Sequence, residues 1–481
     1  SSIVQQLIPV PEVMVSPKGR SIDAEIIGAA EENSNDEGSL QNLAEAGPDA
    51  VDATASVDSV LEGIGFGRFQ VMTMMICGMG WFVDSVEVGG LTYIYVTLDE
   101  VWGTTTQHWG LLQSARSIAS VVGALCFGSL ADKFGRRPAF LATLALTAVG
   151  GVASAAAGNF HSLLLLRVVT NVGAGGILPV AITLLTEHLP PSARDSCMVL
   201  MHVFFASGHV LAVVISMALP STEGMWRIFL LALAAPAALL LLAWRAVPES
   251  PAYLHQSGRE ALARQALEAI SRANGQRKAP VPRLQAPGAK DAEQRTGVPR
   301  LFGTRAGAFQ MALFGLLWAS TMTASDYNSW ITELGHGYGF QKHSVEAFMI
   351  ACKVIGVVAF FAAAACARGG RGSLILCAAY LAAALAAAAS AMAASLEASR
   401  LLVPVCIALL SFPFDIVWSL LYAVTASRFD ALCRASALSV ASGCSRAAAA
   451  VAPLASGALL MRGPLPALCF WSGAWVAACC V

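Results

Sequence analysis

The stretch Gly128-Ser-Leu-Ala-Asp132-Lys-Phe-Gly135-Arg136-Arg137-Pro138 lies between two long apolar runs, at about 109–131 and 139–157. Its carboxylate stands at the end of the first run, and three cations follow across a short turn. Fixed charges are therefore expected where two membrane spans turn back. Such an arrangement suits a charge clasp that holds two moving parts of a membrane protein in one state.

The composition also indicates a membrane protein. Hydrophobic residues make up 56% of the 481 residues, charged residues 13%, and the mean hydropathy is +0.63. A soluble chain has roughly 45–50% apolar and about 25% charged residues, and a single soluble core stops growing beyond about 250–300 residues. The net charge is -1, and no basic block indicates a nucleic-acid partner.

Twelve apolar runs are predicted to be membrane-spanning helices, because each is long enough to cross a hydrocarbon core of ~30 Å. They fall into two groups of six, and the last run is short enough that we expect a truncated span. The expected fold is an all-α membrane protein with two six-helix bundles around a central cavity. The runs lie at about 69–97, 109–131, 139–157, 162–187, 198–219, 226–247, 308–332, 345–366, 373–394, 401–425, 436–460 and 466–481.

Four regions follow from this pattern. Residues 1–63 are acidic and poor in aromatic residues, so we expect a disordered tail. Residues 64–247 and 306–481 are the two predicted bundles. Residues 248–305 are a polar linker, in which 258–274 has the apolar spacing of a short helix.

The distribution of cations predicts the topology. The linker and the turn near residue 133 are rich in Lys and Arg, whereas the connections near 98–108, 158–161 and 220–225 contain none. Cations mark the cytoplasmic side of short loops. The linker and both termini are therefore expected in the cytoplasm.

The twelve Cys residues form no C-x-x-C pair, and most lie inside apolar runs. We interpret them as packing residues, so neither a metal site nor a resident cofactor is predicted. An internal repeat supports the two groups of spans: residues 363–372 are a faded copy of 128–137, in which Ala367 takes the place of Asp132.

Ionisable residues inside the predicted spans mark a candidate pathway, because burying such groups in a bilayer is costly. Asp84 and Glu87 share one face of the first span, and Asp84 lies roughly 22 Å from its cytoplasmic end. Arg116 on the second span lies at a similar depth. The cluster could bind a charged solute, carry protons, or be a structural ion pair. One carboxylate in surplus favours the first two roles.

The second half contributes Lys353 and Asp415 at similar depths, and Asp326 nearer the opposite side. Tyr327 and Trp418 accompany these charges. Most aromatic side chains in spans serve packing, but a Tyr hydroxyl beside a carboxylate needs a hydrogen-bond partner. These five residues complete the predicted solute or proton pathway.

Several motifs resemble one family. The stretch 128–137 matches the loop between helices 2 and 3 of major facilitator superfamily transporters, G-x-x-x-D-[RK]-x-G-[RK]-[RK]. Gly65-Phe-Gly-Arg-Phe-Gln70, Trp81-Phe-Val-Asp-Ser-Val-Glu87 and Pro248-Glu-Ser-Pro-Ala-Tyr-Leu254 resemble the synaptic-vesicle-two-related branch, which is similar to organic ion and sugar porters. In the last motif Ala252 replaces an Arg of the branch pattern.

The resemblance spans about residues 63–460 and weakens in the second half. The T-P-E-x-F-P-T-x-x-R pattern of the family appears as residues 425–434, with Ser427 in place of the Glu and both prolines absent. The resemblance implies cytoplasmic salt bridges that break when the carrier turns inward. The residues it assigns to this gating are Gly128, Asp132, Gly135, Arg136, Arg137, Glu187, Arg194, Glu249 and Arg434.

Two functions from different classes remain open. The first is a monomeric secondary carrier of a small solute, such as an organic ion, coupled to protons through Asp84 and Glu87. The second is a receptor or scaffold that keeps the transporter fold and uses its acidic tail for partners. No P-loop and no nucleophile–base pair occur in the sequence, so neither ATP-driven transport nor an enzyme is predicted.

Overall fold

The computed structural model describes residues 54–219, 224–275, 282–285, 302–367, 371–396, 402–429 and 431–481. Long helices dominate these residues. The regular extended structure among them is one parallel strand pair, β1 (Thr54–Ala55) with β2 (Arg283–Leu284). The prediction of an all-α membrane protein is confirmed.

Six long helices precede the linker, and we call them the N-terminal helices. Their ends agree with the predicted spans to within a few residues, apart from the end of the first and the last. They are α4 (Arg68–Gly90), α6 (Thr106–Phe134), α7 (Arg136–Ser154), α8 (Phe160–Thr186), α9 (Arg194–Ala218) and α10 (Met225–Leu242).

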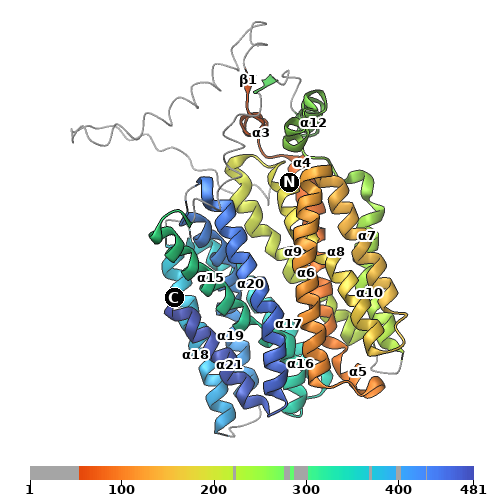
Figure 1. Ribbon diagram of the computed structural model, residues 1–481, viewed down its shortest axis with the longest axis vertical. Helices are drawn as coiled ribbons and strands as arrows, with labels where there is room; N and C mark the ends of the chain where they lie inside the picture. The colour runs from red at the N-terminus through yellow and green to blue at the C-terminus, as the bar shows by residue number, and fades with distance from the viewer. Residues whose placement is uncertain are drawn as a thin grey trace, which may run out of the picture. The chain divides into compact units, whose positions relative to one another are not determined.

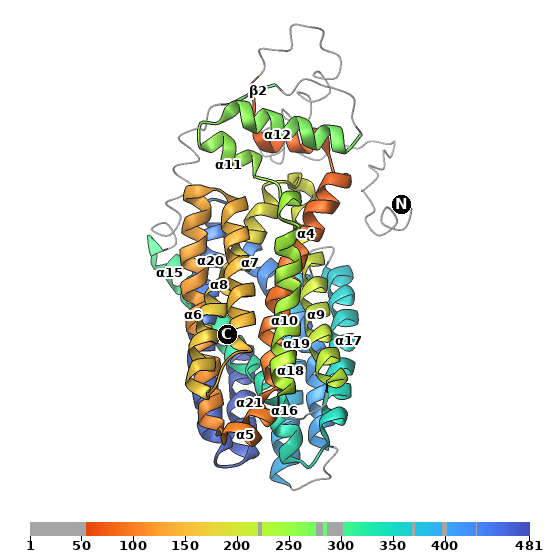
Figure 2. The same ribbon diagram turned by 90° about the vertical axis from the view of Figure 1, so that its right-hand side faces the viewer.

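Seven helices follow the linker, and we call them the C-terminal helices. The two groups lie side by side and meet where α6 packs on α20 and α9 packs on α17 (Figures 1 and 2). The seven are α15 (Arg305–Ser325), α16 (Tyr327–Gly337), α17 (Lys342–Ala367), α18 (Gly372–Ser395), α19 (Leu402–Ser427), α20 (Ala431–Leu460) and α21 (Pro464–Cys480).

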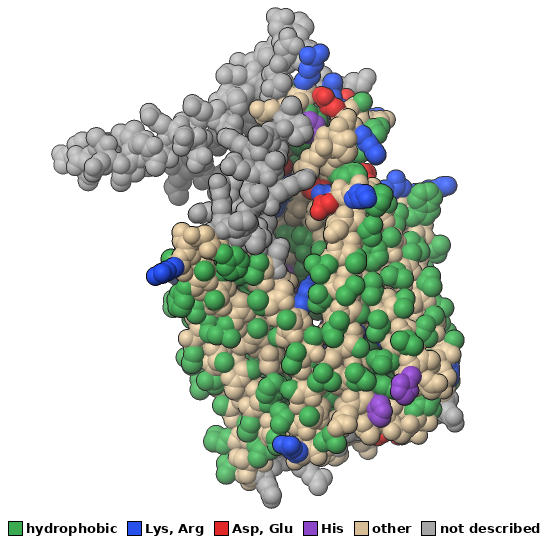
Figure 3. Space-filling model, in the orientation of Figure 1, with side chains coloured by type: hydrophobic (Ala, Val, Ile, Leu, Met, Phe, Trp, Pro, Cys, Tyr) green, Lys and Arg blue, Asp and Glu red, His purple; other side chains and the backbone are tan. Residues whose placement is uncertain are grey.

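The surface of these helices suits lipid. Nine helical segments of the described residues are long and apolar enough to cross a membrane, and α21 is a shorter apolar helix. Leu125, Leu165 and Leu239 are 66–68% exposed. In Figure 3 hydrophobic side chains are spread over the whole flank, whereas most of the acidic and basic side chains lie at the end where Figure 1 labels α12.

Two predicted spans are interrupted. The run 69–97 is helical only to Gly90, after which the 3₁₀ turn η3 (Leu91–Tyr93) leads into α5 (Tyr95–Trp102). Two consecutive glycines, Gly89 and Gly90, precede this break and weaken the helix. The run 308–332 breaks at Asp326, between α15 and α16, where the Asp326 carboxylate accepts hydrogen bonds from Trp330 and Ser456.

The linker and the segment before α4 pack together beyond one end of the helices (Figure 2). The predicted helix at 258–274 is confirmed as α12 (Glu260–Ala273), which follows α11 (Pro251–Gln256). We call this the α12 end of the molecule and the opposite one, where α5 lies, the α5 end.

The predicted boundary of the disordered tail at residue 63 is wrong. Residues Val57–Ile64 form the helix α3, capped by the Ser56 side chain, and Leu61 is fully buried in a cluster with Leu267 and Ile270 of α12. Acidic composition hid a short amphipathic helix that gains its stability from this packing. Residues 1–53 of the predicted tail lie outside the described residues.

Candidate functional site

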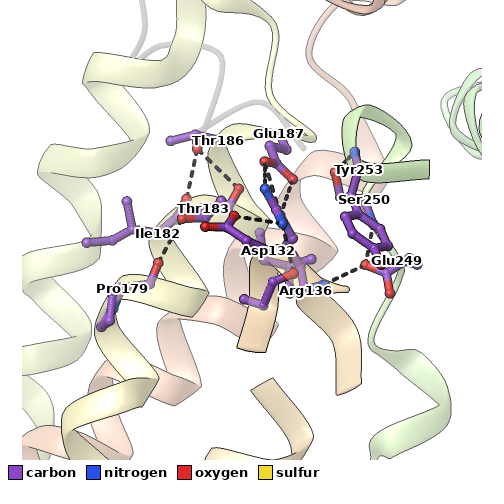
Figure 4. A network of polar contacts seen from close by, with 12 residues as sticks. Asp132, Arg136, Pro179, Ile182, Thr183, Thr186, Glu187, Glu249, Ser250 and Tyr253 are labelled. Atoms are coloured by element: carbon purple, nitrogen blue, oxygen red, sulfur yellow. Dashed lines mark hydrogen bonds and ion pairs between the residues drawn. The ribbon is translucent and has the colours of Figure 1, made fainter. Parts of the chain in front are cut away.

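The charged turn quoted above forms a compact network at the α12 end (Figure 4). The Arg136 guanidinium donates to both carboxylate oxygens of Glu187, with N···O distances of 2.9–3.2 Å. It also pairs with Asp132 at 3.1 Å and donates to the Ala131 carbonyl at 2.8 Å. Arg136 is buried, whereas the Asp132 side chain is 76% exposed. Glu187 is therefore the main partner of Arg136 in this arrangement.

Glu249 has a different role from an ion-pair partner. Its Oε1 accepts hydrogen bonds from the backbone N–H groups of Arg136 and Arg137, at 3.0 and 3.2 Å. These N–H groups open α7 and have no partner within that helix. A carboxylate at this position also complements the positive end of the helix dipole. Glu249 thus caps α7 from the segment that leads to α11.

Gly135 makes this cap possible. Its φ is +115°, which L side chains rarely adopt, and a Cβ there would collide with Oε2 of Glu249. Gly128 differs, because no atom lies within 4 Å of the place its Cβ would take. The structure therefore explains the turn glycine of the motif and gives no steric reason for the first one.

The remaining predicted gating residues are not joined into one network. Arg137 donates to the Trp244 carbonyl at 3.3 Å. Arg194 pairs with Asp58 of α3 at 2.6 Å and donates to the Thr186 carbonyl at 3.1 Å. The side chain of Arg434 lies outside the described residues, as do those of Ala367 and Ser427.

These contacts all join residues that precede the C-terminal helices. The ion pairs Arg136–Glu187, Arg136–Asp132 and Arg194–Asp58 do not cross to the second group of helices. Asp58, in the segment predicted to be disordered, is a partner that the sequence did not reveal.

His188 lies beneath this network and is buried. Its ring nitrogens lie 2.7 Å from the Leu184 carbonyl and 3.2 Å from the Glu249 carbonyl. Burial lowers the pKa of His188, and the carbonyl contacts offset only part of that effect. The imidazole joins the end of α8 to the Glu249 segment.

The charges inside the helices are arranged differently from the prediction. Glu87 forms an ion pair with Arg167 of α8, and both side chains are 0% exposed. The predicted surplus of one carboxylate is therefore wrong, since Arg167 provides the second base. Arg167 lies within the predicted span 162–187 and was not assigned to the site from the sequence. For Glu87, therefore, the structure agrees with the alternative that it is part of a structural ion pair between helices.

Arg116 uses the backbone rather than a carboxylate. Its guanidinium donates to the Val88 carbonyl at 2.9 Å and to the Glu87 carbonyl at 3.5 Å. These carbonyls lie where α4 gives way to η3 and regular helical bonding ends. The break in the first span thus creates the acceptors for Arg116.

Asp84 lies between cations from both groups of helices. It is 6% exposed, and among the described residues it has no hydrogen bond or ion pair. Arg446 of α20 acts on its charge more strongly than Arg116 of α6 does. Arg446 was not among the residues assigned to the site from the sequence. A buried carboxylate without a direct partner is available to a proton or a solute.

Several neutral groups near this level are also buried without partners in the described part of the chain. Both amide atoms of Gln113, the Ser114 hydroxyl and the Trp81 indole N–H have no hydrogen bond there. Gln113 is one helical turn from Arg116 on the same face of α6. Buried polar groups are normally satisfied by protein, water or ligand. These groups could therefore bond a polar solute.

Asp326 belongs to a well-bonded network. It accepts from Ser456 of α20 at 2.5 Å and from the Trp330 indole at 3.1 Å, and Trp471 donates to Ser456 at 3.0 Å. Arg116 acts electrostatically on Asp326 across the two groups of helices. This network fixes Asp326 at the break between α15 and α16.

Lys353 of α17 and Asp415 of α19 were predicted to lie at similar depths. They interact electrostatically, and the Lys353 Nζ lies 5.7 Å from the centre of the Phe414 ring. Tyr327 packs on the same ring, with centroids 5.9 Å apart. Trp418 donates to Ser325 at 3.1 Å, so its contact is with α15.

No group of three or more His, Cys, Asp or Glu that could hold a metal occurs in the described ranges. The cysteines that those ranges describe are unpaired thiols.

This arrangement of helices defines a multi-pass membrane protein with buried charged residues where its two helix groups meet. Residues 37–481 match the family model described as "Sugar (and other) transporter". The chain belongs to this family of the major facilitator superfamily. The family and the relatives below are transporters, in agreement with the prediction that the chain is not an enzyme.

Curated relatives include the organic cation/carnitine transporter 7 of Arabidopsis thaliana, 33% identical over 46% of this chain and 43% of its own. The niacin transporter NiaP of Acinetobacter baylyi is 33% identical over 45% of this chain and 49% of its own. The synaptic vesicle 2-related protein of Xenopus laevis is 32% identical over 48% and 41%. The predicted resemblance is confirmed, and the chain spans less than half the length of these relatives.

Among solved structures, the xylose transporter XylE from E. coli in a partially occluded inward-open conformation has a TM-score of 0.70 and 16% sequence identity. The match covers 86% of this chain and 96% of that one. The predicted major facilitator fold is confirmed.

Proposed function

We propose that this protein is a secondary active transporter of a small polar solute, working by alternating access between the N-terminal and C-terminal helices. The observation that carries the proposal is Asp84, a buried carboxylate without a direct partner between Arg116 and Arg446 of the two groups. Paired helix groups around a site at mid-membrane are the usual construction of secondary transporters.

The solute class is inferred from the side chains that lie at the same depth as Asp84. The charges that act on one another here are balanced, with Asp84, Glu87 and Asp326 against Arg116, Arg167 and Arg446, so the site favours neither a cation nor an anion by net charge. The unpaired amide of Gln113 and the indole N–H of Trp81 add neutral hydrogen-bonding groups. We infer a solute with both polar and ring-like or apolar parts, in the size class of niacin and carnitine, which the relatives' names mention.

The coupling ion is proposed to be the proton, taken up at Asp84. Glu87 is committed to Arg167 and is assigned a structural role. We also place the α12 end in the cytoplasm, because the cations of the charged turn and of α12 gather there. The chain is taken to act as a monomer.

The test is solute uptake by the purified protein in proteoliposomes, with niacin, carnitine, xylose and a set of organic cations. Each solute is measured with and without an inward proton gradient, and protein-free liposomes are the control. We expect saturable uptake of at least one solute class that rises with the gradient. No uptake of any solute by folded protein would favour the receptor or scaffold alternative.

A further inference from the structure

A histidine lies at the depth of Asp84 on the neighbouring helix. α9 packs along α4, and both helices begin at the α12 end. His209 is about 22 Å along α9 from its start, and Asp84 lies at a similar distance along α4. The imidazole fits between the two helices because a glycine faces it: a Cβ on Gly89 would lie 2.8 Å from Cδ2 of the ring. Phe205 packs on the other side, with ring centroids 5.4 Å apart, so the ring is held in one place.

The hydrogen bonds of Ser85 decide which ring nitrogen of His209 carries the hydrogen. The Ser85 hydroxyl is fully buried and donates its one hydrogen to the Phe205 carbonyl. The same oxygen lies 2.6 Å from Nδ1 of His209, so in that contact it accepts. Nδ1 therefore carries the hydrogen, and in the neutral ring Nε2 is left as an acceptor.

Burial and two cations favour the neutral ring. Lys353 of α17 and Arg116 of α6 both act electrostatically on His209. A proton on Nε2 would add a third positive charge beside them, which like-charge repulsion opposes. Lys353 belongs to the C-terminal helices and Arg116 to the N-terminal helices, so the imidazole lies where the two groups meet.

Nε2 of His209 is left without a partner. It has no hydrogen bond in the part of the chain that the structure describes. Arg116 does not donate to it, since its guanidinium donates to the Val88 carbonyl. Buried acceptors are normally satisfied by protein, water or ligand. The ring therefore offers an oriented acceptor at the depth of the proposed solute site.

We propose that His209 determines specificity in the solute site, where its Nε2 accepts a hydrogen bond from a neutral O–H or N–H group of the solute. A donor that carries positive charge, such as a protonated amine, would lie beside Lys353 and Arg116 and is disfavoured by repulsion. The solute class is therefore hydroxyl- or amide-bearing molecules. This inference rests on the proposed function, because it names the group by which the same site recognises its solute.

Ser85 is a positioning residue, because it acts through His209. Without its hydroxyl, Nδ1 loses the acceptor that holds the hydrogen there. The ring can then carry the hydrogen on Nε2, where an N–H group would face the donor of the solute. Ser85→Ala should therefore weaken the preference for a donor-bearing solute.

The experiment measures binding to the purified full chain in nanodiscs by titration calorimetry at neutral pH. Two pairs of probes are used: carnitine with its deoxy analogue, and nicotinamide with its N,N-dimethyl analogue. Within each pair only the first member has the neutral donor. We expect the donor-bearing member of at least one pair to bind about tenfold more tightly than its analogue. Equal binding within both pairs, or no binding of either donor-bearing probe, would overturn the proposal.

His209→Gln and His209→Asn are a matched pair of variants. The amide of Gln reaches the place of Nε2 and can accept there, whereas the amide of Asn reaches only the place of Nδ1 and keeps the contact with Ser85. We expect the preference to remain in His209→Gln and to be lost in His209→Asn. Ser207→Ala, at an exposed position of α9, is the control and should bind like the parent protein. The same loss in both His209 variants would show that the ring only packs between helices.

Nitrogen NMR of protein labelled at histidine tests the tautomer directly. The signals that are absent in His209→Asn belong to His209. We expect an unprotonated Nε2 in the parent protein, a change of its signal when the donor-bearing probe is added, and partial protonation of Nε2 in Ser85→Ala. A protonated Nε2 in the parent protein would overturn the proposal.

Binding and NMR do not depend on transport, so the two proposals can fail separately. Protein that binds the probes with this preference but carries none of them into proteoliposomes would contradict the proposed function alone. Protein that carries both members of each pair equally well, with equal binding, would contradict only the role of His209.

Discussion

Glu87 of α4 and Arg167 of α8 form an ion pair in which neither side chain reaches solvent. Removing one member of such a pair leaves an uncompensated buried charge, whereas replacing both members can be nearly neutral. The pair therefore joins α4 to α8, and Asp84 is the acid of α4 to which we assign the proposed coupling.

The first prediction concerns this pair. Glu87→Gln should lower the free energy of unfolding by ~3–5 kcal/mol, because Arg167 stays charged and buried. The double variant Glu87→Gln with Arg167→Met should regain most of that loss. Unfolding in detergent, followed by circular dichroism, measures both. If the single variant is as stable as the parent protein, Glu87 is not structural, and the sequence-based expectation that Glu87 takes part in proton coupling would apply instead.

The second prediction compares two glycines of the charged turn. Gly135→Ala should destabilise the protein by about 1–3 kcal/mol, because its φ of +115° is strained for alanine and Glu249 occupies the Cβ position. Gly128→Ala is the matched control and should be neutral or slightly stabilising, since nothing lies within 4 Å of its Cβ position. Thermal unfolding of the two variants side by side tests the cap. Equal losses would show that Glu249 does not depend on this turn.

The third prediction separates the two partners of Arg136. Asp132 is mostly exposed here and is free to meet the C-terminal helices when the α12 end closes. Asp132→Asn should therefore favour the arrangement in which the α12 end is open and the α5 end is closed. The expected change is modest, several-fold, as for one exposed ion pair. Glu187→Gln should instead lower the melting temperature, since it breaks the bidentate contact with buried Arg136.

Labelling of single cysteines on each face, in a background without the native cysteines, measures the ratio of the two arrangements. An unchanged ratio in Asp132→Asn would show that its charge serves orientation during insertion and not gating.

The fourth prediction is a pH dependence of stability at His188. Because burial lowers the pKa of His188 in the folded state, the unfolded chain binds a proton that the folded one does not. Its contribution to stability should be intact above about pH 6.5 and be lost progressively as the pH falls below that value. His188→Gln should flatten this part of the curve, whereas His161→Gln, at an exposed position, should leave it unchanged. A parent-like acid loss in His188→Gln would contradict the assignment.

The spans could be predicted well from the sequence because their apolar runs are long. A helix that faces lipid has apolar residues along its whole length. The breaks at Gly90 and Asp326 were not predicted, since both lie inside long apolar runs whose hydropathy continues past the break. Composition also hid α3, whose acidic sequence becomes helical only against α12.

The charged turn was predicted to act as a unit. The role of each residue in it could be assigned only from the structure. Sequence distance gave no indication that Glu249 caps α7 or that Arg194 binds Asp58. Arg167 could have been found from the sequence as an ionisable residue in a span. Its pairing with Glu87 could not, because residues 80 positions apart meet only after α4 and α8 pack.

The most direct test of the account is proton-driven uptake by Asp84→Asn, with Asp99→Asn as the matched variant at an exposed carboxylate of α5. Both are reconstituted in proteoliposomes and assayed with the solute that the parent protein carries best. We predict that Asp84→Asn folds like the parent and loses at least tenfold of the uptake driven by a proton gradient, while Asp99→Asn retains it. Parent-like, gradient-dependent uptake by Asp84→Asn would contradict the assignment of this carboxylate as the coupling site.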